Sequence, residues 1–267
     1  MIRGLTQPCV VSARPRDAGP PDARSPRVLH VITGLGAGGA EHTLVSLAVS
    51  LRSTGQPVAV AALAADGPNR ARLEAAGVVV HDLAMRRDRV DPIAALRLAR
   101  IIRATRPAIV QGWMYHADLL ALVGLWLSGR RSVTRLVWSI RCSDMDARRY
   151  GALFRATLGA WKAFSGRADA VIANSDAGIA THRAMGCRFR TVIRIDNGVE
   201  IDRFRPDLEA RDRVRRDLGI AVDESVVAIV GRVDPMKGFD RFLRVVDRLP
   251  GVRMLAIGLG TEALPTR

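Results

Sequence analysis

The chain has 267 residues, 48% of them hydrophobic, which is enough to bury one large core or two modest ones. Its 41 lysine and arginine residues against 26 acidic residues give a formal charge of +15, a balance that favours phosphate-bearing substrates or anionic membrane surfaces. Aromatic residues make up only 4% of the chain, and we find neither zinc-finger spacing nor aromatic–basic interleaving, which argues against a nucleic-acid partner.

The cysteines and the longest apolar run bear on the compartment. Cys9, Cys142 and Cys187 form no CxxC pair, which argues for a reducing compartment and against a disulfide framework or a zinc site. No signal-peptide core is visible near the N-terminus. The run 119–127 is far shorter than the roughly 20 residues that span a bilayer. We therefore expect a cytoplasmic protein, with peripheral contact at the inner face of the cell membrane as an open alternative.

The first predicted element after the N-terminal segment is a strand that runs into a glycine-rich loop. Residues 1–26 hold five of the thirteen prolines and no periodicity, so we expect a disordered leader or an over-extended reading frame. Residues 27–33 are apolar and rich in β-branched side chains. The loop and the helical spacing that follow rest on Gly34, Gly36, Gly38, Gly39, Leu44, Leu47, Ala48 and Leu51. Such a loop brings the backbone close to a phosphate or a sugar at a helix N-terminus.

Beyond this loop, apolar strand-like runs alternate with helical patterns such as residues 91–105. This alternation predicts βαβ units, a parallel sheet and right-handed crossovers. Residues 198–208 interrupt the pattern with glycine, proline and charge, so we expect an N-terminal domain over 27–200 and a partial C-terminal domain over 201–267. The further predicted strands are 57–64, 77–84, 107–113, 135–141, 170–175, 191–196, 226–232 and 253–258.

The glycine loop admits a second interpretation. Gly34, Gly36 and Gly39 match G-x-G-x-x-G, and Asp66 follows the next predicted strand, as in a dinucleotide-binding fold. An NAD(P)-dependent oxidoreductase is therefore an alternative function. The spacing to Asp66 is longer than usual, and Asp66 is also an ordinary turn residue.

Three other segments carry candidate chemistry. In GRVDPMKGFD (231–240), Arg232 and Lys237 follow a strand, where two cations suit a diphosphate, although a solvated basic loop would look the same. His116 follows the strand 107–113 and precedes the predicted helix 117–128, so it is either a proton-transfer or hydroxyl-binding group or a packed histidine. Asp144 and Asp146 form a D-x-D, which is a metal-binding pair in some sugar transferases and more often a solvated loop.

Five blocks together resemble the retaining glycosyltransferases of family GT4, of the type found in bacterial polysaccharide and lipopolysaccharide synthesis. The resemblance runs from about Arg27 to the chain end, and the blocks stand in the family's order. They are VLHVITGLGAGGAEHTLVSLA, QGWMYHADLLALVG, VIANSDAGIATHRAMG, IDNGVEIDRFRPD and VGRVDPMKGFDRFL. The resemblance implies an α/β fold of the GT-B type, with a Rossmann-like N-terminal domain and an incomplete second Rossmann-like domain.

The resemblance also implies a reaction and its residues. A hexose would pass from a nucleotide-sugar to a glycan or lipid-linked acceptor, with no metal and no cofactor. His116 and Glu41 would be catalytic, and the donor would be bound by Gly36, Gly38, Gly39, Asn197, Gly198, Arg232 and Lys237. Fixed cations and N–H dipoles would stabilise the charge that grows on the departing diphosphate.

The chain departs from the family pattern near its end, because it stops before the family's pair of glutamates seven residues apart. We therefore expect a truncated product with impaired activity, and a catalytically inactive GT-like binding protein stays open as an alternative. An anionic membrane surface is a further predicted partner. The apolar helix 117–128, followed by Arg130, Arg131 and Arg135, suits such a surface, although a buried core helix is the competing interpretation.

Overall fold

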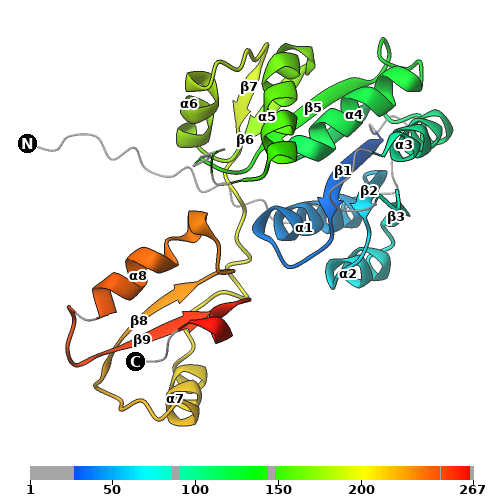
Figure 1. Cartoon of the computed structure of the whole chain (residues 1–267). Coiled ribbons are helices and arrows are strands. Elements are labelled where there is room, and N and C mark those ends of the chain that lie inside the picture. Colours follow the sequence, from blue (N-terminus) through cyan, green and yellow to red (C-terminus); the bar gives the residue numbers. More distant parts are fainter. Residues whose placement is uncertain (1–26, 86–90, 144–147, 149, 247, 265–267) are drawn as a thin grey trace, which may run out of the picture. The chain divides into compact units, whose positions relative to one another are not determined.

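The computed structural model describes residues 27–85, 91–143, 148, 150–246 and 248–264 (Figure 1). They form two compact units: unit 1 comprises 27–143 and 150–197, and unit 2 comprises 148 and 198–264. The division after Asn197 falls beside the domain boundary expected from the sequence. The predicted leader, residues 1–26, lies outside the described residues. No helix in the described ranges is long and apolar enough to cross a membrane.

Unit 1 is built on one seven-stranded parallel sheet with the order β3-β2-β1-β4-β5-β6-β7. This confirms the predicted parallel α/β arrangement. The order reverses between β1 and β4, which places the topological switch point, where ligands bind in open α/β sheets, at the carboxyl ends of these two strands. The strands are β1 (Val28–Gly34), β2 (Val58–Ala64), β3 (Val79–Asp82), β4 (Ile109–Trp113), β5 (Arg135–Ile140), β6 (Ala170–Ala173) and β7 (Val192–Arg194).

Helices cover both faces of this sheet. On one face, Leu44, Val45 and Ala48 pack into the same buried cluster as β2 residues. On the other face, the helices that follow β3 and β4 pack closely, because Gly124 has no Cβ, which would lie 2.8 Å from the Leu98 side chain. The helices are α1 (Gly39–Ser53), α2 (Asn69–Ala75), α3 (Pro92–Thr105), α4 (Tyr115–Leu127), α5 (Ala152–Phe164) and α6 (Asp176–Ala184).

Local signals account for several helix starts. Asp91 caps α3 by accepting a hydrogen bond from the Ile93 N–H at 2.8 Å, and Pro92 occupies the first turn. α4 begins at Tyr115, two residues before the predicted start, so His116 lies inside its first turn. This correction matters because the helix fixes the direction of the His116 side chain.

Unit 2 contains a two-stranded parallel sheet of β8 (Ser225–Val230) and β9 (Val252–Ile257), with α7 (Leu208–Asp217) and α8 (Phe239–Val246). Both predicted strands are confirmed. The sheet is thinly covered: Val227, Val230 and Ile257 are all exposed. The short helix η3 (Pro235–Lys237) lies in the loop between β8 and α8.

Candidate functional site at the carboxyl edge of unit 1

The glycine-rich loop leaves free space beside Gly36 and Gly39 at the N-terminus of α1, whereas the Glu41 carboxylate lies beside Gly38. Gly38 is the N-cap of this helix and provides no side-chain hydrogen bond to it. A Cβ on Gly36 or Gly39 would meet no atom within 4 Å, so the space beside both residues is free. This free space lies near the positive end of the helix dipole, where a phosphate or a sugar oxygen could bind.

Gly67, in the loop between β2 and α2, and Asn69, the first residue of α2, hold the glycine loop in place. The Asn69 side chain donates from Nδ2 to the Gly36 carbonyl at 2.5 Å, and its backbone N–H donates to the Leu35 carbonyl at 3.2 Å. Gly67 has a φ of +129°, and a Cβ there would lie 2.4 Å from the Leu35 oxygen. Sequence reasoning missed both residues, because only the fold brings residues 67 and 69 against residues 35 and 36.

Glu41 lies in the first turn of α1, directly over the N-cap. A Cβ on Gly38 would lie 2.2 Å from Glu41 Oε2, so the carboxylate folds back over this glycine. An acid at this position interacts favourably with the helix dipole. Glu41 therefore lies at the predicted glycine loop, with its charge at the end of the helix that a ligand would approach.

His116 follows β4, as expected, but packs against α5. Its Nε2 lies 3.3 Å from Thr157 Oγ1, and its ring centroid lies 6.0 Å from that of Phe154. Burial lowers the pKa of His116 below its usual value, which favours the neutral imidazole. A neutral ring can accept a proton or bind a hydroxyl group, so the predicted role stays a prediction.

The turn before His116 is strained. Met114, the N-cap of α4, has φ +74° and ψ 158°, a region that is populated almost only by glycine. The next residue is anchored in the core: the Tyr115 hydroxyl lies 2.7 Å from His182 Nε2, while His182 Nδ1 donates to the Gly178 carbonyl at 2.7 Å. Since Nδ1 carries the proton, Nε2 accepts from the tyrosine. This fixed contact holds the turn in its strained form.

Arg141 is the cation that sequence reasoning missed. It directly follows β5, and its guanidinium carbon lies 4.1 Å from the ring centroid of Trp113, the last residue of β4. Its Nη1 donates to Asn197 Oδ1 at 3.1 Å. Burial lowers the pKa of Arg141 to about 10, partly opposed by Asp118, so the side chain stays charged at neutral pH. The predicted donor residue Asn197 therefore contacts a cation at the carboxyl edge of unit 1.

Two buried titratable groups lie near Arg141. His30 Nδ1 accepts a hydrogen bond from Trp113 Nε1 at 3.2 Å, and burial, with a smaller contribution from Arg141, lowers the pKa of His30 to about 4. Asp118 is fully buried and accepts from Trp161 Nε1 at 2.8 Å. Burial raises the pKa of Asp118 well above its usual value. Both pKa shifts favour the neutral form of the side chain, so neither His30 nor Asp118 balances the positive charge of Arg141 well.

In unit 2, the structure brings Arg232 and Lys237 together around Asp234. Arg232 Nη2 lies 3.0 Å from Asp234 Oδ2. The backbone N–H of Met236 donates to Asp234 and lowers its pKa, and both cations add to the shift. The aliphatic part of Lys237 lies beside Gly231, which directly follows β8. The predicted cationic loop exists as a local structure, and Asp234 organises it.

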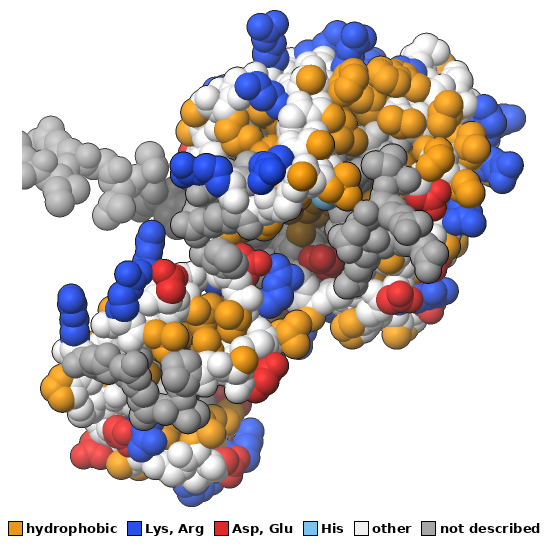
Figure 2. Space-filling view, viewed as in Figure 1, with side chains coloured by type: hydrophobic (Ala, Val, Ile, Leu, Met, Phe, Trp, Pro, Cys, Tyr) orange, Lys and Arg blue, Asp and Glu red, His pale blue; other side chains and the backbone are white. Residues whose placement is uncertain are grey.

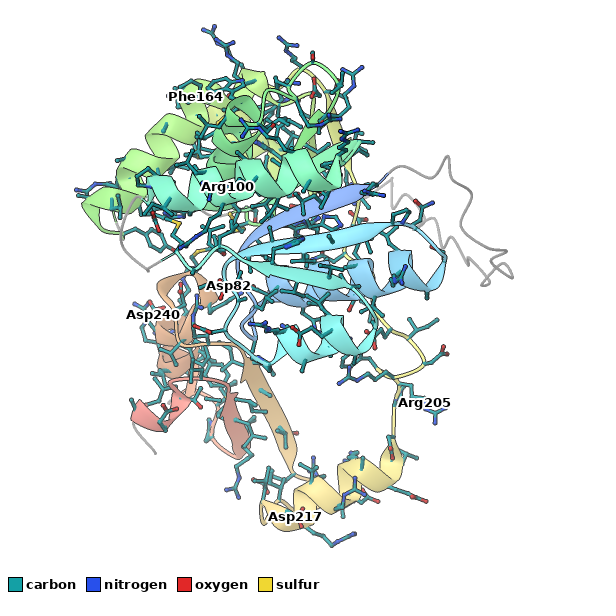
Figure 3. All side chains as sticks on the ribbon, turned by 90° about the vertical axis from the view of Figure 1, so that its right-hand side faces the viewer. Asp82, Arg100, Phe164, Arg205, Asp217 and Asp240 are labelled. Atoms are coloured by element: carbon teal, nitrogen blue, oxygen red, sulfur yellow. The ribbon has the colours of Figure 1, made fainter. Side chains whose placement is uncertain are left out.

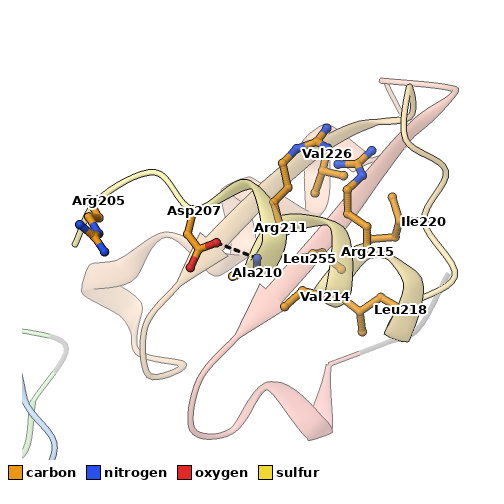
Figure 4. Close-up of a pocket in the computed structure, with 10 residues that line it drawn as sticks. All are labelled: Arg205, Asp207, Ala210, Arg211, Val214, Arg215, Leu218, Ile220, Val226 and Leu255. Atoms are coloured by element: carbon orange, nitrogen blue, oxygen red, sulfur yellow. Dashed lines mark hydrogen bonds between the residues drawn. The ribbon is translucent and has the colours of Figure 1, made fainter. Parts of the chain in front are cut away.

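Unit 2 also contains a hollow of about 430 Å³, which is lined by residues other than Arg232 and Lys237 (Figure 4). Val214 of α7 and Leu218, its C-cap residue, line the hollow together with Val226 and Leu255, and Val226 is the second residue of β8. The hollow is thus near the amino end of β8, away from the loop of Arg232 and Lys237. It does not contain the predicted donor residues.

The remaining predicted residues are placed as follows. Gly36, Gly38, Gly39, Glu41, His116 and Asn197 belong to unit 1, whereas Gly198, Arg232 and Lys237 belong to unit 2. Gly198 is exposed, with space for a Cβ. Asp144 and Asp146 lie outside the described residues. Within the described ranges, no three His, Cys, Asp or Glu side chains cluster as metal ligands would.

Comparison with known proteins gives one family match and several relatives. The family model described as Glycosyltransferase Family 4 matches residues 37–203. The D-inositol 3-phosphate glycosyltransferase of Mycobacterium marinum is 41% identical over 95 residues, which are 34% of this chain and 19% of that protein. The protein of that name from Mycobacterium tuberculosis strain F11 is 42% identical over 95 residues, again 34% of this chain and 19% of that protein.

Solved structures share the fold. Anabaena Alr3699/HepE in complex with UDP and glucose aligns with a TM-score of 0.71 at 19% identity, over 89% of this chain and 63% of that chain. Sucrose-phosphate synthase from Thermosynechococcus elongatus aligns with a TM-score of 0.68 at 16% identity, over 87% of this chain and 62% of that chain. These matches confirm the predicted GT-B-like α/β fold class. The chain spans less than two thirds of the length of either structure.

Proposed function

The chain belongs to Glycosyltransferase Family 4, and from this premise we propose that it transfers a hexose-type sugar from a nucleotide-sugar to an acceptor. The family match over residues 37–203 carries the proposal, since it includes Gly38, Gly39, His116 and Asn197. The complex of Anabaena Alr3699/HepE with UDP and glucose supports a nucleotide-sugar as the donor. We extend the proposal to retention of anomeric configuration, to a reaction without metal or cofactor, and to cell-surface polysaccharide synthesis in the cytoplasm.

The chemistry of the proposed site follows from its charges. Breaking a glycosyl–phosphate bond leaves negative charge on the diphosphate. Arg232 and Lys237, in the loop at the carboxyl end of β8, supply two positive charges to stabilise it. Fixed cations can neutralise the leaving group in place of a metal ion. His116 would contact the transferred sugar, and Glu41 would lie beside the glycine loop.

We propose a glycan or lipid-linked acceptor, presented at the inner face of the membrane. An exposed apolar face of unit 1 supports this location. Figure 2 shows hydrophobic side chains gathered over α3 and α4, and Figure 3 labels Phe164 of α5 and Arg100 of α3. Trp126 and Phe164 contact each other edge to face while both stay exposed. The apolar face comprises Ile93, Leu96, Val123, Trp126, Leu127 and Phe164.

The sequence predicts Arg130, Arg131 and Arg135 as the cations beside this apolar face, but the structure pairs two of them with an acid. Arg131 and Arg135 both pair with Asp169, at 3.0 and 3.7 Å, so their charges are partly neutralised. Arg103 instead lies at the end of α4, where it donates to the carbonyls of Leu127 and Ser128. The buried side of α4, which includes Leu122 and Leu125, confirms that this helix is also a core helix.

Incubation of the purified chain with UDP- and GDP-sugars and a membrane extract tests the function. We expect radiolabelled sugar to enter the lipid or glycan fraction, and Lys237→Met to reduce its incorporation. Arg244→Met, which removes an exposed arginine paired with Asp240 on α8, is the matched control. Absence of transfer from every donor would contradict the proposal.

A further inference from the structure

We propose that Arg141 binds a phosphate group of a ligand at the carboxyl edge of unit 1, on the face of the sheet that also bears the glycine loop. The inference rests on the proposed function for the kind of ligand.

The register of the sheet places Arg141 beside the switch point. His30 pairs with Gln111, and Gln111 pairs with Val137, so alternate residues of the three strands share one face. Trp113, the last residue of β4, and Arg141, which directly follows β5, continue this face, and the Gln111–Ser139 hydrogen bond of 2.9 Å lies on it. Since β1 and β5 flank β4, Arg141 and the end of β1 are separated by about 10 Å. A phosphorylated sugar can bridge that distance.

The contacts of Arg141 hold the guanidinium without neutralising it. The Trp113 ring supports it through a cation–π contact, and Asn197 accepts one of its five N–H groups. Its Nε is buried and lacks a hydrogen-bond partner. No carboxylate of the described chain forms an ion pair with it. A partly buried, pre-oriented guanidinium with unused donors is suited to bidentate binding of phosphate oxygens.

A purely structural role leaves two of these features unexplained. Linking Asn197 to the sheet needs a single donor, which a neutral glutamine also supplies. A cation costs desolvation free energy at this place, and burying its Nε without a partner adds to that cost. A phosphate would supply both the missing charge and the missing acceptor.

Calorimetric titration of the full chain with inorganic pyrophosphate, D-inositol 3-phosphate and UDP tests the proposal. We expect Arg141→Met to weaken at least one of these ligands by about tenfold to a hundredfold, the range for a lost charge-assisted contact. Arg141→Lys keeps the charge without the fork and should weaken it less. Arg183→Met, at an exposed arginine of α6, removes the same charge and should change affinity less than twofold.

The three ligands separate the two sources of phosphate. Weaker binding of UDP or pyrophosphate assigns Arg141 to the donor diphosphate, and weaker binding of D-inositol 3-phosphate alone assigns it to a phosphorylated acceptor. Arg141→Gln, which retains a donor for Asn197, replaces the methionine variant if that one melts at a lower temperature. Equal affinities in the Arg141 and Arg183 variants, or no saturable binding of any ligand to the unchanged chain, overturn the proposal. A chain that binds phosphate through Arg141 but transfers no sugar overturns only the proposed function.

Discussion

Asn69, the first residue of α2, holds the glycine loop through one hydrogen bond: its side-chain amide donates to the backbone carbonyl of Gly36 at 2.5 Å. Asn69 is buried, so its loss leaves a carbonyl of the glycine loop without its partner. We expect Asn69→Ala to lower the free energy of unfolding by about 1–3 kcal/mol and to speed amide exchange at Gly36 and Gly38. Urea unfolding and hydrogen exchange measure both effects.

The control for this change lies on the same helix. Glu74→Ala removes an exposed ion pair with Arg70, which should cost no more than about 0.5 kcal/mol and leave exchange in the glycine loop unchanged. Equal exchange rates in the Asn69 variant and the wild-type chain would show that the loop is held by other contacts.

Met114 lies between two residues of the site, Trp113 and Tyr115, in a conformation that suits glycine. Met114→Gly and Met114→Ala both remove the side chain, but only glycine relieves the backbone strain. We therefore expect the glycine variant to be more stable than the alanine variant by about 1–3 kcal/mol, measured by urea unfolding. An alanine variant as stable as the glycine variant would rule out strain at this turn.

His30 predicts a pH dependence of stability. Burial lowers its pKa from 6.5 to about 4 in the folded chain, so the unfolded chain binds more protons between these values. Its contribution, about 3 kcal/mol at most, is present above pH 6.5 and is lost as the pH falls towards 4. Urea midpoints between pH 4 and 7 measure this slope. His30→Asn keeps an acceptor for Trp113 and should flatten it.

The lowered pKa values of His81, His116 and His182, all due first to burial, add slopes of the same sign. The His30 variant should therefore retain part of the pH dependence. If its profile matches that of the unchanged chain, His30 does not titrate as a buried neutral group.

The apolar face of unit 1 predicts membrane binding. Trp126 and Phe164 are exposed large aromatic side chains that contact each other. We expect the double variant Trp126→Ser, Phe164→Ser to bind vesicles containing anionic lipid at least about tenfold more weakly in co-sedimentation, because each ring buries apolar area in the interface. Val79→Ser, at an exposed residue of the edge strand β3, should have no effect. Equal binding of the two variants would exclude this face.

The strands were predictable because each lies in a short run rich in apolar and β-branched residues, and all nine runs form strands. Single-residue contacts were not. Arg141 is one of 39 arginines, obtained by subtracting the two lysines from 41 basic residues, and only its position over Trp113 distinguishes it. Nothing in the sequence indicates that the Asn69 side chain contacts Gly36. His116 was correctly placed after a strand, but its packing against Thr157 depends on α5, forty residues later in the chain.

Thermal melting with UDP, GDP and NADH tests whether this chain binds a nucleoside diphosphate-sugar. A ligand at a hundred times its Kd adds about 2.7 kcal/mol to the stability of the chain that binds it. We expect UDP or GDP to raise the Tm of the unchanged chain, and Lys237→Met to reduce that rise. A Tm that rises with NADH alone, or with none of the three, would contradict the account.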